Sequence, residues 1–219
     1  MTLRGALLRF AGALAVVVLP ACAHLPRDIA RHQAAAPYVP ANFTGDPAIP
    51  SDIRRVVLLP LDRGGQATPE VGRELDAILR DALQQQGRFE VVTLSRDDCR
   101  RMFGAESFNS STALPNGFLA KVGEKFAAQA VMFVDLTGYR YLRPLMVGFR
   151  AKLAKVDDSR IIWAFDEQID AQTPGVEAAV KARYADPGDP VSMADAALRS
   201  PSRFDAFAAT SMFSTLPGR

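Results

Sequence analysis

Histidine and cysteine are scarce in this sequence, and their scarcity removes whole classes of chemistry. The 219 residues include two histidines, His24 and His32, and two cysteines, Cys22 and Cys99. No histidine follows residue 32, which excludes a serine–histidine triad or a histidine-containing zinc site from the rest of the chain. A lone cysteine after residue 22 also excludes CxxC redox chemistry there. We therefore expect neither a metal site nor a cofactor.

Glycine-rich enzyme motifs are also missing. The chain has no GxSxG turn, no phosphate-binding GxxxxGK[ST] loop and no GxGxxG fingerprint. Gly64-Gly65 follows the first expected strand, and we interpret this pair as a turn rather than a ligand-binding loop. Cys99 shares the apolar stripe of a predicted helix with Met102 and Phe103, which favours a buried structural thiol over a reactive one.

An excess of charge of one sign is absent as well. The chain has 26 Lys and Arg against 24 Asp and Glu, and removal of Arg4 and Arg9 with a leader would leave 24 against 24. Nucleic-acid binding needs a basic excess or a basic stripe, so we expect no nucleic-acid partner. With 48% apolar residues and 13 Phe, a disordered or fibrous protein is excluded, and the length fits one domain with extensions.

The N-terminal residues resemble a bacterial lipoprotein leader. Arg4 and Arg9 make a basic start, and the twelve residues 10–21 are uncharged and mainly apolar. A helix of that length rises only about 18 Å, short of the roughly 30 Å hydrocarbon layer, so a permanent span is not expected. The sequence LPAC at 19–22 resembles a lipobox. The resemblance implies a signal peptide over residues 1–21 and acylation of Cys22.

Two consequences follow from this leader. Ala23 stands where an aspartate would signal inner-membrane retention in many Gram-negative bacteria, so the resemblance favours a lipid anchor on the periplasmic face of the outer membrane. The alternative is a soluble secreted protein cut nearby, in which Cys22 is incidental. Residues 22–50 show no helical or strand period and contain five prolines, so we expect an extended tether.

Residues 51–219 are predicted to form one periplasmic α/β domain. The run RRVVLLPLD at 54–62 is typical of a strand buried on both faces. An amphipathic helix is expected after Thr68-Pro69, followed by a second strand and two further helices. Three consecutive strands then follow without a helix between them, and two helices end the chain. We expect a single mixed sheet of about five strands packed by helices, with strands at 54–62, 89–94, 130–142, 145–156 and 160–171 and helices at 69–87, 95–104, 116–127, 174–183 and from Ser200-Pro201.

The register of the last hairpin can be predicted. A three-residue loop at 157–159 would pair Val156 with Arg160, and so place Leu153 opposite Trp163, Ala151 opposite Phe165, Val147 opposite Ile169 and Arg150 opposite Asp166. Such loops usually place a left-handed residue third, here Ser159. In 145–153 the apolar residues alternate with Arg150 and Lys152, so one face of the sheet is expected to be core and the other exposed to water.

The remaining polar residues supply one candidate binding surface and no catalytic site. Asp135 interrupts an apolar strand and, if buried, needs a partner, for which Arg140 and Arg150 are the candidates. We interpret the carboxylates as structural. The stretch containing Tyr139, Arg140, Tyr141 and Arg143 is the candidate partner-binding surface, because exposed Tyr and Arg are typical binding anchors. Ordinary sheet packing of the tyrosines remains the alternative.

Residues 131–171, which read VMFVDLTGYRYLRPLMVGFRAKLAKVDDSRIIWAFDEQIDA, resemble bacterial envelope lipoproteins related to the periplasmic domain of the curli secretion channel family. VVLLPLD and its helix also resemble the opening strand of that domain. The resemblance covers residues 56–216 and implies an α/β domain similar to the amino-terminal domain of TolB, with its anticodon-binding-like fold, and to lipoprotein activators of peptidoglycan synthases. The chain departs from the curli channel in having no spare strands for membrane hairpins, which need about 9–11 residues each.

These observations predict a non-enzymatic outer-membrane lipoprotein whose periplasmic domain binds another envelope component. Two alternatives stay open. One is a ring-forming subunit of a secretion or assembly complex, which would make the chain a homo-oligomer. The other is an acid-dependent cell-wall hydrolase, which would require convergent carboxylates around Asp135 or Asp166.

Overall fold

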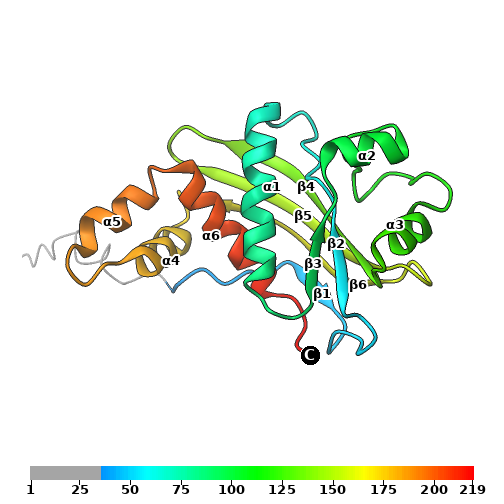
Figure 1. The fold of residues 1–219 in the computed structure, drawn as a ribbon. Helices are drawn as coiled ribbons and strands as arrows, with labels where there is room; N and C mark the ends of the chain where they lie inside the picture. Colours follow the sequence, from blue (N-terminus) through cyan, green and yellow to red (C-terminus); the bar gives the residue numbers. More distant parts are fainter. Residues whose placement is uncertain (1–35) are drawn as a thin grey trace, which may run out of the picture. The chain divides into compact units, whose positions relative to one another are not determined.

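Six strands form one open mixed sheet in the computed structural model, which describes residues 36–219 (Figure 1). The order across the sheet is β1-β6-β5-β4-β2-β3. β2 pairs in parallel with β3 and β4, whereas β4, β5, β6 and β1 pair in antiparallel succession. The predicted α/β class is confirmed, with six strands in place of five. The strands are β1 Phe43–Gly45, β2 Arg55–Leu58, β3 Glu90–Thr93, β4 Ala130–Arg140, β5 Met146–Lys155 and β6 Ile161–Asp170.

Helices cover the two faces of the sheet in different ways. On one face α1 packs along α6 over the larger apolar core, and on the other α2 and α3 cover a smaller core (Figure 1). β2 contributes to both, because Val56 and Leu58 belong to the larger core and Val57 and Leu59 to the smaller one. This strand is therefore buried on both faces, as its apolar run predicts. The helices are α1 Pro69–Gln84, α2 Arg96–Phe103, α3 Phe118–Phe126, α4 Pro174–Tyr184, α5 Pro190–Ala197 and α6 Pro201–Ser214.

Local sequence determines where the main helices begin. The hydroxyl oxygens of Thr68, Ser95 and Ser200 accept hydrogen bonds from backbone N–H groups in the first turns of α1, α2 and α6. Such caps satisfy donors that have no partner within the helix. Gly104 ends α2 with φ of 81°, a left-handed conformation that suits glycine. In the part of the chain that the structure describes, every helix is too short or too polar to cross a membrane.

The predicted register of the β5–β6 hairpin is confirmed along most of its length. Leu153 pairs with Trp163, Ala151 with Phe165, Val147 with Ile169 and Arg150 with Asp166. Near the turn the pairing shifts by one residue after Leu153, so Ala154 pairs with Ile161 and the predicted pairing of Val156 with Arg160 is wrong. A bulge of this kind adds a residue to one strand, which alternation alone does not indicate. Ser159 adopts φ of 60°, the left-handed conformation expected of it.

The sixth strand lies in the segment that was expected to be an extended tether. β1 pairs with β6 through Phe43 and Phe165, and Ile49 is buried in the larger core. Three residues are too few to show a strand period, so the pairing partner determines this strand. α5 is a second difference, since no helix is expected between residue 183 and Ser200. Cys22 and the leader lie outside the described residues.

Candidate functional site

The four residues of the predicted binding surface have different environments. Tyr139 is half-buried, and its hydroxyl donates to Asp205 Oδ2 on α6 at 3.0 Å. Arg140 donates to Asp170 Oδ2 at 2.9 Å and to the Pro144 carbonyl. Tyr141 and Arg143 are exposed in the turn that follows β4. Tyr139 and Arg140 therefore hold elements together, and only Tyr141 and Arg143 are free to bind a partner.

A crevice of about 460 Å³ lies elsewhere, at the carboxyl ends of β2 and β3. From the end of β2 the chain turns to α1 on one face of the sheet, and from the end of β3 it turns to α2 on the other face. Adjacent strands whose connections leave in opposite directions produce a gap that α/β proteins commonly use for binding. The crevice is lined by the ends of both strands, one side of α1 and the start of α2, with charged residues Arg73, Asp76, Arg80, Arg96, Asp97, Arg100 and Glu106.

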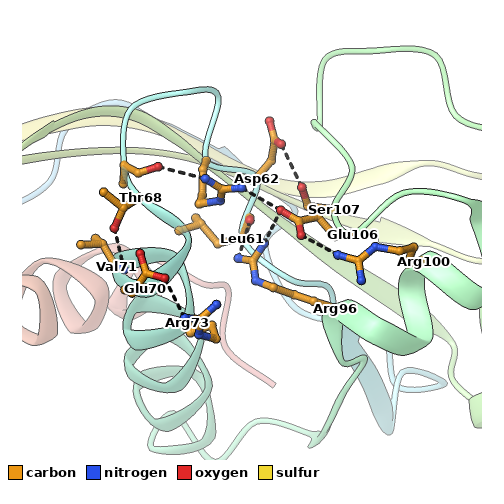
Figure 2. A network of polar contacts seen from close by, with 12 residues as sticks. Leu61, Asp62, Thr68, Glu70, Val71, Arg73, Arg96, Arg100, Glu106 and Ser107 are labelled. Atoms are coloured by element: carbon orange, nitrogen blue, oxygen red, sulfur yellow. Dashed lines mark hydrogen bonds and ion pairs between the residues drawn. The ribbon is translucent and has the colours of Figure 1, made fainter.

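Arg96 joins the walls of the crevice. Its guanidinium donates to both carboxylate oxygens of Asp76 on α1, at 2.7 and 3.1 Å. It also donates to the Leu61 carbonyl beyond β2 at 2.9 Å (Figure 2). Asp76 also accepts from the Leu61 N–H at 2.8 Å. Burial raises the pKa of Asp76, against the lowering effect of Arg96. The pair thus fastens α1 and α2 to the end of the same strand.

Glu106 is the second centre of the network. Its carboxylate accepts from Arg63 at 2.7 Å and from Arg100 at 2.9 Å, and Arg96 Nη1 lies 3.7 Å away (Figure 2). The hydrogen bond from Arg63 holds the pKa of Glu106 below its ordinary value. Arg96 Nη1 is buried and has no hydrogen-bond partner among the described residues. The lining of the crevice as a whole carries four arginines, Arg73, Arg80, Arg96 and Arg100, against three carboxylates, Asp76, Asp97 and Glu106.

Two aspartates hold the loop that follows α2. Asp62 accepts from the Ser107 hydroxyl at 3.1 Å and from the Asn109 amide at 2.9 Å. Asp135 accepts from the Ser110 N–H at 2.9 Å and from its hydroxyl at 2.6 Å. Ser110, and neither Arg140 nor Arg150, is therefore the hydrogen-bonding partner of Asp135; Arg150 lies opposite Asp135 in the strand pairing and acts on it through its charge.

Asp135 and Asp166, the two carboxylates around which a hydrolytic site would have to form, are both held by hydrogen bonds within the fold. Burial raises the pKa of Asp135, which accepts both of its hydrogen bonds from Ser110. Asp166 accepts from Arg150 Nε at 2.8 Å across the hairpin. Cys99 is buried, and burial raises the pKa of its thiol to about 11. Over residues 36–219, no three His, Cys, Asp or Glu side chains are grouped as a metal site would require.

Sequence reasoning missed the crevice because its residues come from four separate segments. Asp76 and Arg96 are twenty positions apart, and only the fold brings them together. One signal was available: Arg96 and Arg100 are spaced i, i+4 at the start of a helix capped by Ser95, which places both on one side of that helix. Which residues Arg96 and Arg100 face depends on the parallel pairing of β2 and β3, which places the start of α2 beside the end of β2.

Comparisons with known proteins give structural likenesses only. Neither a protein-family model nor a curated protein matches the chain. The PelC dodecamer from Paraburkholderia phytofirmans aligns with a TM-score of 0.49 and 15% identity over 81% of this chain and 96% of that one. Lipoprotein GNA1162 from Neisseria meningitidis gives 0.38 and 16% over 53% and 79%. The LpoB C-terminal domain from Escherichia coli gives 0.36 and 17% over 53% and 82%. These values support no statement about function.

Proposed function

We propose that this protein is an outer-membrane-anchored periplasmic lipoprotein that binds another envelope component and catalyses no reaction. The basic, apolar leader and the LPAC sequence ending at Cys22 support the anchor. The resemblance of residues 131–171 to envelope lipoproteins supports the location. The charged side chains that line the crevice already have ion-pair partners, which agrees with a role in binding and not in catalysis.

The crevice at the carboxyl ends of β2 and β3 is the observation on which the binding role depends. It is open to solvent; on its rim Arg73 and Arg100 are exposed and Arg80 is half-buried. Each of these guanidiniums has a carboxylate partner that is exposed or half-buried, and exposed pairs contribute only about 0–1 kcal/mol. A partner that carries carboxylates can therefore compete for the arginines at low cost.

A pull-down from solubilised envelopes, using the Cys22-anchored protein as bait, tests this role. The double variant Arg80→Ser/Arg100→Ser removes two rim charges and should lose a protein that the wild type retains. Arg101→Ser is the matched control, because Arg101 lies on the same helix, is exposed and pairs with Asp98, but does not line the crevice. Equal retention by all three proteins would reject the crevice as the binding site.

The two alternatives give different outcomes. A ring-forming subunit would appear as one discrete high-mass species in light scattering of the purified protein. A cell-wall hydrolase would release soluble fragments from peptidoglycan, and that activity would fall on substitution of Asp135 or Asp166. Neither alternative is supported by a specific contact: Asp135 is hydrogen-bonded to Ser110, Asp166 is paired with Arg150, and the edge strands β1 and β3 have only three and four residues.

A further inference from the structure

The turn between β4 and β5, residues 141–145, exposes apolar side chains to solvent. Tyr141 is 62% exposed and Leu142 is 65% exposed. Arg143 beside them is exposed and has no hydrogen bond or ion pair with any residue that the structure describes. Two adjacent apolar residues at the tip of a hairpin contribute nothing to the core, so their exposure suggests contact with something outside the chain.

A third exposed apolar residue lies at the same end of the sheet. Val39 is 73% exposed, and its neighbour Tyr38 donates its N–H to the Gly175 carbonyl at 3.0 Å. Gly175 comes shortly after the end of β6. The carboxyl end of β6 lies at the same end of the sheet as the β4–β5 turn (Figure 1). Met146 at the start of β5 pairs both with Arg140 at the end of β4 and with Asp170 at the end of β6. Residues 36–39 therefore enter the fold at the end of the sheet that carries the β4–β5 turn.

The position of the chain's entry limits the distance to the anchor. Thirteen residues, 23–35, separate Cys22 from the first described residue. A chain of that length spans at most about 45 Å when fully extended. If Cys22 is acylated, as the proposed function requires, this end of the sheet stays within that distance of the bilayer. The opposite end, where β6 begins, is farther along the chain from the anchor.

We propose that this end of the sheet contacts the membrane in which Cys22 is anchored, with Tyr141 and Leu142 inserted into its interfacial layer and Arg143 among the lipid phosphates. Tyrosine is enriched at that depth, since its ring is apolar and its hydroxyl stays hydrated. Arginine can extend to the headgroups while its stem stays apolar. The surface adds a second attachment to the acyl anchor, and it rests on the anchoring part of the proposed function.

A fluorescent probe tests the insertion directly. The variants Leu142→Cys and Ile161→Cys would be labelled with an environment-sensitive dye in the acylated full-length protein and reconstituted into vesicles of phosphatidylethanolamine and phosphatidylglycerol. Ile161 is the matched control, because it is 45% exposed and lies at the opposite end of β6. Cys99 is buried and should take up no dye, which the protein without an added cysteine verifies.

Insertion predicts a blue-shifted emission at position 142 that lipid-borne quenchers reduce, and an emission at position 161 as in water. Equal, water-like emission at both positions would overturn the proposal, including the case in which the turn binds a protein instead of lipid. Flotation separates the two hypotheses. Protein that fails to float with vesicles refutes the anchor at Cys22, whereas protein that floats with an unshifted probe at 142 refutes only the contact of the turn.

A second measurement removes the anchor. For the mature chain carrying Cys22→Ala, Tyr141→Ser/Leu142→Ser should lower the partition coefficient into the same vesicles about tenfold, as expected for the loss of two partly buried apolar side chains. Ile161→Ser should leave it unchanged. Arg143→Ser should lower it only in vesicles that contain phosphatidylglycerol. Identical partition of the double variant and the Ile161→Ser control would reject the contact.

Discussion

The docking of α6 on the sheet should weaken as the pH rises, because a buried carboxylate must ionise there. Asp205 is only 4% exposed and accepts a hydrogen bond from Tyr139 on β4. Burial raises its pKa from the ordinary 3.8 to about 7; the Tyr139 hydroxyl opposes this rise, and Glu74 on α1 adds to it. Between these two values the unfolded chain is ionised at this position while the folded chain keeps its proton.

The sign of the effect follows from linkage. Because the folded state binds the extra proton, the free energy of unfolding falls as the pH rises from about 4 to about 7 and changes no further above that. The full shift corresponds to about 4 kcal/mol, and the part between about pH 5 and pH 8 to about 3 kcal/mol. Asp205→Asn keeps an oxygen that can accept from Tyr139 but carries no charge, so it removes this dependence.

Thermal unfolding of wild type and Asp205→Asn at about pH 5 and pH 8 measures the difference. The advantage of the variant in Tm should grow by at least about 5 °C between the two conditions. Tyr139→Phe removes the hydrogen bond that favours the ionised carboxylate, so its loss of stability should continue to a higher pH than that of wild type. Asp97→Asn, an exposed control, should follow the wild-type profile. Parallel profiles for Asp205→Asn and wild type would refute a buried carboxylate with a raised pKa.

Three further predictions concern stability. Ser159→Gly should raise the free energy of unfolding by about 0.5–1 kcal/mol, because Ser159 has φ of 60°, and an unchanged or lower Tm would contradict the observed turn. Glu106→Gln should lower it by about 1–2 kcal/mol at neutral pH. Because the pKa of Glu106 is lowered in the folded protein, the difference in free energy of unfolding between wild type and variant should disappear as the pH falls below the ordinary value of 4.5. Acid-induced unfolding of both proteins checks this. Gly148→Ala should cost about 1–3 kcal/mol in urea unfolding, because its Cβ would lie 2.6 Å from Thr137 Oγ1; a neutral result would show that the strands adjust there.

Much of this fold is predictable from local signals. Apolar runs identify β2 and β4, alternation identifies β5, and Thr68, Ser95 and Ser200 mark helix starts that the structure confirms. β1 is different, because three residues carry no period and its strand exists only through pairing with β6. The bulge beyond Leu153 shifts the register without changing the pattern of apolar residues. Local sequence specifies elements well and their long-range pairing poorly.

The candidate sites were harder to predict, for a related reason. Tyr139, Arg140, Tyr141 and Arg143 are adjacent in sequence, yet two hold helix or strand neighbours and two are exposed. Alternation along a strand cannot show where the strand ends and the exposed turn begins. The crevice around Arg96 depends on the parallel order of β2 and β3, which no single segment encodes.

The crevice and the β4–β5 turn are separated along β4, so we expect them to act independently. β2 runs parallel to β4, and Leu58 at its carboxyl end pairs with Met132, nine residues before Tyr141. Nine residues of extended strand span about 30 Å. Tyr141→Ser/Leu142→Ser should therefore leave capture of a partner by the crevice unchanged, and Arg80→Ser/Arg100→Ser should leave the probe emission at position 142 unchanged. Loss of capture on substitution of the turn alone would contradict this separation.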